Sequence, residues 1–103
     1  MLREKSNFSD EYAIFLATLR RYRKRSGRTQ TDIAEHMMRD QSVVSKCERG
    51  ERRIDVIELR SYCRAIGIEL RTFVDALEKD IEQAKRLNAS AKARVRSSKS
   101  RAS

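Results

Sequence analysis

The sequence lacks proline and tryptophan, and its 103 residues include only three glycines, two cysteines and one histidine. Cys47 and Cys63 fall on apolar stripes and are not spaced like metal ligands, so we expect reduced core residues. His36 is expected on the surface, late in a short helix. These few residues exclude a zinc cluster or a catalytic triad built from the usual parts.

Long apolar runs are also absent. No segment approaches the roughly 20 apolar residues of a membrane-spanning helix, and residues 1–12 lack the apolar core of a secretory signal. We therefore expect a cytoplasmic protein without a membrane anchor. A chain of 103 residues holds one small domain and a tail at most.

Charge is abundant and unbalanced. Lys and Arg number 24 against 15 Asp and Glu, which gives a formal net charge of +9. A basic chain favours a polyanionic partner, with nucleic acid as the first candidate and an acidic membrane surface as its competitor. The sequence offers no pair of nucleophile and base and no glycine-rich phosphate loop, so we expect neither an enzyme nor a bound cofactor or metal.

The apolar spacing predicts an all-α fold of five helices, and each glycine follows an apolar-periodic segment where a helix is expected to stop. The first helix is expected from about Ser9 or Asp10 to about Ser26. The second begins after Thr29, whose hydroxyl can cap it, with Asp32 at its third position. The apolar positions of these two helices are Tyr12, Phe15, Leu16, Leu19, Tyr22, Ile33, Ala34 and Met37.

The third helix is predicted over 41–49, with Asp40 as its cap and with Val44 and Cys47 turned inward. The fourth is predicted to begin with a capping box between Asp55 and Glu58 and to end at Gly67. Its expected inner face is Val56, Leu59, Tyr62, Cys63 and Ile66.

The fifth helix is expected to open near Glu69 and to reach about residue 90. A heptad-like apolar stripe along it predicts either a dimer contact or a solvated extension. The dimerisation residues are then Val74, Leu77, Ile81 and Ala84. We divide the chain into an N-terminal segment (1–8), a domain (9–77), a helical extension (78–90) and a basic tail without packed structure (91–103), which either tracks phosphates or keeps the chain soluble.

Residues from about 19 to 74 resemble the helix-turn-helix domain of Cro and phage repressors, the XRE family. The motifs that carry the resemblance are Gly27, Thr29-Gln30, Ile33-Ala34, Gln41-Ser42, Val44-Ser45, Glu48-Arg49-Gly50 and Ala65-Ile66-Gly67-Ile68. Their order and spacing are specific together, although each piece alone is weak. The resemblance implies a lambda-repressor-like DNA-binding domain with an extended C-terminal helix.

The resemblance also implies structural roles. Ala34 would occupy the tight contact between the second and third helices, and Arg23 with Glu48 would form an ion pair that locks the third helix to the first. One departure is Met38, where the family usually has glycine. A bulky residue forced to positive φ there costs on the order of 1 kcal/mol, unless Arg39 or Asp40 takes the strain.

In such a domain the third helix lies in the major groove of DNA. Gln41 can pair with adenine, Ser42 and Ser45 can meet a base or a phosphate, and Lys46 can reach guanine or the backbone. The expected phosphate contacts are Thr29, Gln30, Arg28, Arg49, Arg52 and Arg53. An ordinary solvated helix face remains the alternative for all these positions.

The function that the resemblance implies is sequence-specific regulation of transcription, as a repressor or autoregulator. A homodimer would place two third helices about 34 Å apart on a palindromic double-stranded DNA site. Two alternatives stay open: an antitoxin-like module that binds another protein through its fifth helix, and a basic protein that binds DNA or RNA without reading bases.

Overall fold

The computed structural model describes the backbone of residues 2–102 and the side chains of residues 10–91. This part of the chain contains five helices and no strand, which confirms the predicted all-α fold. The helices are α1 (Leu2–Ser26), α2 (Gln30–Met37), α3 (Gln41–Glu48), α4 (Val56–Ala65) and α5 (Leu70–Ala102). None of the helices in the described residues is long and apolar enough to cross a membrane.

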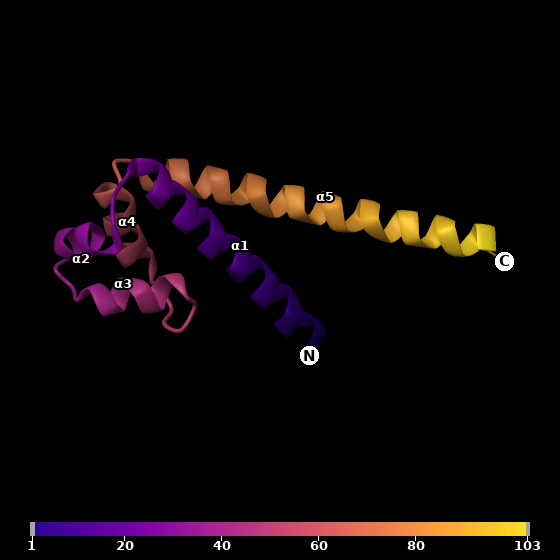
Figure 1. Cartoon of the computed structure of the whole chain (residues 1–103), viewed down its shortest axis with the longest axis horizontal. Coiled ribbons are helices and arrows are strands. Elements are labelled where there is room, and N and C mark those ends of the chain that lie inside the picture. The colour runs from indigo at the N-terminus through magenta and orange to yellow at the C-terminus, as the bar shows by residue number, and fades with distance from the viewer. Residues whose placement is uncertain (1, 103) are drawn as a thin grey trace.

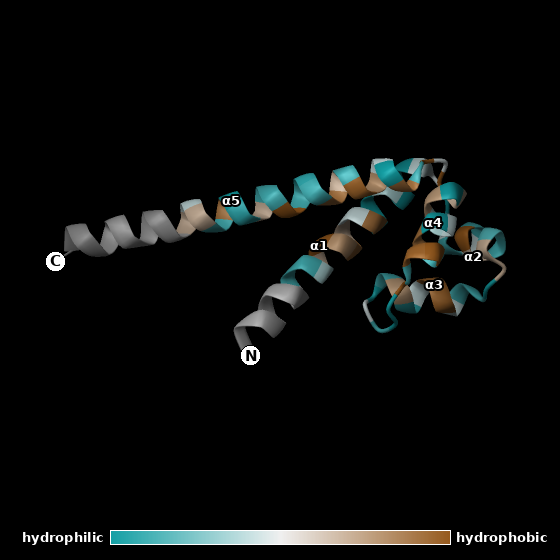
Figure 2. Cartoon of the chain, turned by 180° about the vertical axis from the view of Figure 1, so that it is seen from behind, coloured by the Kyte–Doolittle hydropathy of each residue, from teal (hydrophilic) through white to brown (hydrophobic). Residues whose placement is uncertain are grey.

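The helices form a compact head from which two long helices diverge (Figure 1). The short helices α2, α3 and α4 pack together with the C-terminal half of α1 and the start of α5. Beyond the head, α5 projects alone, and the molecule measures 60 × 26 × 19 Å. Hydrophobic residues gather where the helices of the head face one another, whereas the coloured part of α5 beyond the head is mainly hydrophilic (Figure 2).

The core joins all five helices. Leu19, Ile33, Tyr62, Cys63 and Phe73 are each at most 1% exposed. The remaining buried apolar residues are Phe15, Leu16, Ala34, Val44, Cys47, Ala65 and Ile66. Both cysteines are buried and reduced, as predicted, and burial raises the pKa of the Cys63 thiol to about 11.

Two of the three predicted helix caps form in full. Thr29 with Asp32 and Asp55 with Glu58 each make a capping box. Asp40 is the N-cap of α3, but the predicted side-chain cap was wrong, because its carboxylate makes no cap hydrogen bond. The amide of Val43, which a capping side chain would have satisfied, donates instead to the Asp40 carbonyl at 3.0 Å.

Two helix boundaries and one burial prediction differ from the sequence interpretation. α1 begins at Leu2 instead of Ser9 or Asp10, and α5 continues to Ala102 instead of ending near residue 90. The terminal segments contain no glycine or proline that would stop a helix. The side chains of 1–9 and 92–103 lie outside the described residues. Val56, predicted to face inward, is 62% exposed because it opens the first turn of α4 at the rim of the head.

Met38 itself adopts the left-handed conformation after α2, with φ 57° and ψ 45°. Of the two alternatives for the turn, the strain therefore stays on Met38 and does not pass to Arg39 or Asp40. Its side chain is 89% exposed, so packing does not compensate for the backbone conformation.

Replacing Met38 by glycine is expected to raise the free energy of unfolding by about 1 kcal/mol, because glycine adopts positive φ without a steric penalty. Urea denaturation measures this change. The Met38→Ala variant is the control: it keeps the Cβ atom and should stay within a few tenths of a kcal/mol of the wild type. A glycine variant less stable than the alanine variant would contradict the conclusion that the backbone of Met38 is strained.

Candidate nucleic-acid interface

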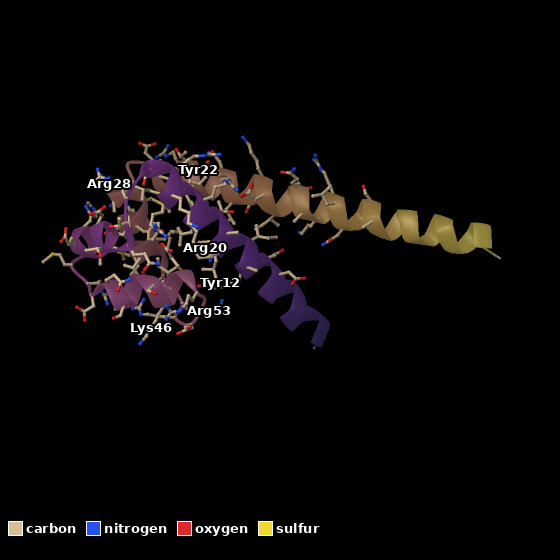
Figure 3. The ribbon with its side chains drawn as sticks, in the orientation of Figure 1. Tyr12, Arg20, Tyr22, Arg28, Lys46 and Arg53 are labelled. Carbon is tan, nitrogen blue, oxygen red and sulfur yellow. The ribbon has the colours of Figure 1, made fainter. Side chains whose placement is uncertain are left out.

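The outer face of α3 carries the side chains for which base reading is predicted. Val44 and Cys47 are buried beneath the helix, so the opposite face turns to solvent. Gln41, Ser42 and Lys46 are exposed and Ser45 is half-buried. Lys46 points outward from α3, away from the rest of the head (Figure 3). The structure thus brings the four predicted residues together on one accessible helix face.

A buried ion pair fixes the end of α3 to α1. The guanidinium of Arg23 donates two hydrogen bonds to the Glu48 carboxylate, at 2.6 and 2.9 Å. The Tyr62 hydroxyl also donates to this carboxylate, which is 2% exposed. Arg20, which the sequence interpretation did not single out, donates from α1 to the Glu48 carbonyl at 2.6 Å. The orientation of α3 is therefore set by contacts at its C-terminal end.

The charge states of this cluster follow from its geometry. Burial opposes the ionisation of Glu48, but hydrogen bonds from Arg23, Tyr62 and Gln30 outweigh it and lower the pKa of the carboxyl group. Burial and the hydrogen bond to Glu48 raise the pKa of Tyr62. Glu48 is ionised and Tyr62 is neutral at neutral pH, and this is the state in which all the hydrogen bonds can form.

Gln30 connects the ion pair to the reading face. Its amide nitrogen donates to Glu48 at 3.0 Å, and its amide oxygen accepts a hydrogen bond from Gln41 at 2.6 Å. Both ends of the Gln30 amide are thereby fixed. The Gln41 amide is oriented as a result, with its own oxygen left for an outside partner.

The N-terminus of α2 lies beside this face, with Arg28 and Thr29 before it. The Thr29 hydroxyl accepts from the Asp32 amide at 3.1 Å, and the Asp32 carboxylate accepts from the Thr29 amide at 2.9 Å. The hydrogen bond from the Thr29 backbone lowers the pKa of Asp32. The Thr29 hydroxyl is therefore engaged in the helix cap, while the side chain of Arg28 remains exposed.

The three arginines after α3 all have contacts within the chain. Arg49 bonds to Glu51 at 2.8 Å and to the Ser45 hydroxyl. Arg53 lies 4.2 Å from the centre of the Tyr12 ring (Figure 3). These two side chains are exposed and stay at the surface next to α3.

Arg52 differs from its neighbours because it forms a two-pronged ion pair with Glu58, at 3.1 and 3.0 Å. It also donates to the Cys47 sulfur at 3.5 Å, and the ion pair with Glu58 raises the pKa of Arg52. The sequence interpretation missed this structural role. Glu58 was recognised only as a cap, and no periodic spacing links it to Arg52 across a loop.

The predicted dimerisation stripe divides between two surfaces. Leu77 and Ile81 line an apolar groove of about 340 Å³. The other apolar residues of this groove come from α1, α4 and the loop before α4, and they are Tyr12, Phe15, Ile54, Val56 and Leu59. Val74 lies in a different groove, and Ala84 is half-buried farther along α5. The four residues therefore do not form one continuous exposed seam.

Known proteins share the sequence pattern and the architecture described above. A family profile described as a helix-turn-helix domain matches residues 14–77. An XRE-family like protein from Pseudomonas syringae pv. tomato str. DC3000 is 37% identical, with a TM-score of 0.72 over 77% of this chain and 96% of that one. The clp gene regulator ClgR from Corynebacterium glutamicum is 22% identical and shares the fold, with a TM-score of 0.70 over 81% and 88% of the two chains. No curated protein matches significantly.

Proposed function

Because this chain belongs to the XRE type of helix-turn-helix proteins, a family of DNA-binding transcription regulators, we propose that it is a sequence-specific repressor or autoregulator. In this proposal α3 enters the major groove of an operator and the bound protein blocks a promoter. The observation that carries the proposal is the polar outer face of α3, held in place by the Arg23 and Glu48 pair beneath it.

The proposal involves two kinds of contact with DNA, to base edges and to phosphates. Gln41, Ser42, Ser45 and Lys46 read base edges, because amide, hydroxyl and ammonium groups match the donors and acceptors of the major groove. Thr29 and Gln30 approach a phosphate through the backbone at the N-terminus of α2, since the side-chain amide of Gln30 is engaged by Glu48 and Gln41. Arg28, Arg49 and Arg53 bind neighbouring phosphates. Arg52 acts mainly within the protein, since Glu58 already occupies its guanidinium.

Selection of bound duplexes from a random pool tests this function. A specific reader should enrich a symmetric consensus and prefer it over random duplex by about 10³-fold or more. Binding is then measured at several salt concentrations. A protein that binds all duplexes equally, and loses affinity for all of them alike as salt rises, would be a charge-driven binder and would contradict the proposal.

We further propose that the regulator is a homodimer that pairs through the apolar groove between α1, α4 and α5. Val56 lines this groove, and Val56 and Ile57 are 62% and 71% exposed at the start of α4. Each copy thus has both a groove and protruding aliphatic residues at its edge, which suits the self-complementary contact of a two-fold dimer. Leu77 and Ile81 contribute from within the groove.

The Val56→Asp variant is expected to sediment as a monomer at concentrations where the wild type is a dimer, because Val56 lines the groove and the interface would bury an unpaired charge. Sedimentation equilibrium measures the mass. Leu87→Asp is the matched control, since Leu87 is 60% exposed on α5 and does not line the groove. If Leu87→Asp dissociates the dimer and Val56→Asp does not, the contact lies along α5 instead.

A further inference from the structure

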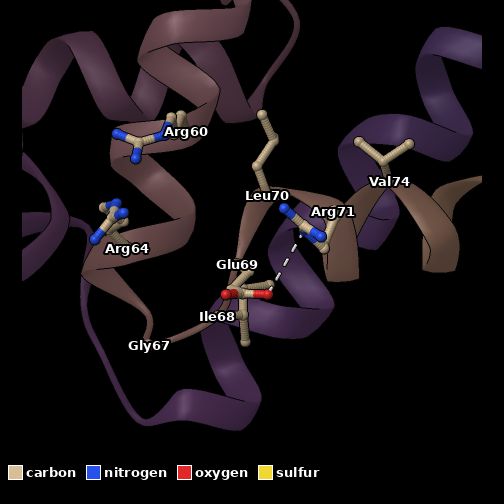
Figure 4. A pocket seen from close by; sticks show the side chains of 8 residues that line it. All are labelled: Arg60, Arg64, Gly67, Ile68, Glu69, Leu70, Arg71 and Val74. Carbon is tan, nitrogen blue, oxygen red and sulfur yellow. Dashed lines mark ion pairs between the residues drawn. The ribbon is translucent and has the colours of Figure 1, made fainter.

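A second groove lies between the end of α4 and the start of α5 (Figure 4). Its volume is about 720 Å³. We call it the arginine groove, after the charged side chains on its walls. The basic side chains are Arg60 and Arg64 from α4 and Arg71 from α5. Glu69 and the apolar residues Ile68, Leu70 and Val74 also line the groove, and Leu70 lies between the two walls in Figure 4.

The arginine groove lies away from α3, the proposed base-reading helix. The connection between α4 and α5 and the helix α3 are at opposite ends of the head (Figure 1). A duplex bound along α3 would leave the arginine groove accessible. The charge of this groove therefore has no role in the proposed reading of DNA.

Contacts within the protein do not explain the presence of these arginines either. Arg60 and Arg64 are exposed, and among the described residues neither side chain makes a hydrogen bond or an ion pair. Arg71 has only Glu69, at 3.8 Å, and both side chains are more than three-quarters exposed. Such a pair contributes little to stability and is easily exchanged for another partner.

The arrangement of the groove indicates the chemistry of its ligand. Arg60 and Arg64 stand one helical turn apart on one wall and Arg71 stands on the other, so the cations match several spaced anions better than one. Guanidinium groups form bidentate ion pairs with carboxylates. The apolar residues of the same lining favour a ligand that carries aliphatic or aromatic groups beside its charges, which a bare phosphate backbone does not supply.

We propose that the arginine groove binds an acidic segment of a partner protein, with apolar side chains between its carboxylates. This partner is additional to DNA and goes beyond the proposed function. Because α3 and the arginine groove lie at opposite ends of the head (Figure 1), the regulator can hold both ligands at once, which would couple a bound operator to a second protein.

Peptide selection on the full chain tests the proposal without knowledge of the partner. Displayed random peptides of about twelve residues, long enough to fill a groove, are panned against the protein, and the enriched peptides are synthesised with a fluorescent label. They should combine Asp or Glu with Leu, Ile or Phe. The double variant Arg60→Glu, Arg64→Glu should weaken their binding by about tenfold or more.

The matched control is the double variant Lys79→Glu, Arg86→Glu, which changes the net charge equally at exposed positions of α5 outside the groove. It should leave peptide binding within about twofold of the wild type at moderate salt. Equal losses in both variants, or enrichment of peptides without acidic residues, would overturn the proposal. So would a single-stranded oligonucleotide that outcompetes the peptides in a manner dependent on Arg60 and Arg64.

Operator binding by the same variants separates this proposal from the function on DNA. The groove variant and the control should bind duplex DNA with equal affinity, since they carry the same net charge. A larger loss for the groove variant would place these arginines on DNA and overturn the peptide site. A wild type with no duplex preference would refute operator reading while leaving the peptide result to stand on its own.

Discussion

The Glu48→Gln variant is expected to unfold with a free energy about 3 kcal/mol below that of the wild type. Removing the carboxylate charge leaves the Arg23 guanidinium without its counter-ion, and this side chain is only 13% exposed. Removing one partner of a buried ion pair costs about 3 to 5 kcal/mol. Glutamine keeps nearly the same volume, so a cavity does not contribute. Urea denaturation at neutral pH measures the difference.

The control for this variant is the same substitution at an exposed pair. Glu51 pairs with Arg49 at 2.8 Å, but both side chains are more than half exposed. The Glu51→Gln variant should therefore change stability by no more than about 0.5 kcal/mol. If Glu48→Gln were as mild as Glu51→Gln, the buried pair would not fix α3 to α1.

The ionisation of Glu48 should also make the stability of the protein depend on pH. The pKa of Glu48 is lowered from an ordinary value of 4.5, so the unfolded chain binds its proton more readily than the folded one. The stabilisation is complete above that ordinary value and is lost as pH falls below it toward the folded pKa. The Glu48→Gln variant should lose less stability than the wild type over that acidic range.

Local features of the sequence predicted most of the fold. Helix caps and apolar spacing depend on residues three or four positions apart, and this explains why Thr29 with Asp32, Asp55 with Glu58, and the stripe through Leu19 were recognised. The start of α1 and the end of α5 were not, because the interpretation stopped each helix where apolar residues became sparse. Backbone propensity continues a helix in the absence of glycine or proline.

Contacts between distant segments limited the prediction of the site. The Arg23 and Glu48 pair could be expected only through the family resemblance. Arg52 with Glu58 joins two residues across a loop, and Arg20 bonds to a backbone carbonyl that no sequence pattern reveals. In the same way, Leu77 and Ile81 formed a heptad-like stripe, yet they lie against the groove beside α1, because α1 supplies the nearest apolar surface.

These contacts give the reading face a support that extends from the core to its surface. The carboxylate of Glu48 holds the amide nitrogen of Gln30, and the oxygen of Gln30 holds the amide of Gln41. A base-reading side chain is thereby positioned through hydrogen bonds to a buried charge. Preorganisation of this kind reduces the entropy lost when the side chain pairs with a base.

On the selected operator, Gln41→Ala should reduce the binding free energy by about 1 to 3 kcal/mol and relax the choice of base at one step, because a two-pronged contact with a base is lost. Gln30→Ala should also weaken binding, since it removes the support of Gln41. Titration of the operator and of duplexes altered at each single position measures both affinity and base choice.

The double variant decides whether Gln30 acts through Gln41. If it does, Gln30→Ala should have a smaller effect once Gln41 is alanine, with a coupling energy of about 0.5 kcal/mol or more. A phosphate contact made by Gln30 alone would instead give additive losses, equal on operator and random duplex. Additive losses would therefore show that Gln30 does not act through Gln41. An unchanged base preference in Gln41→Ala would show that Gln41 does not read a base.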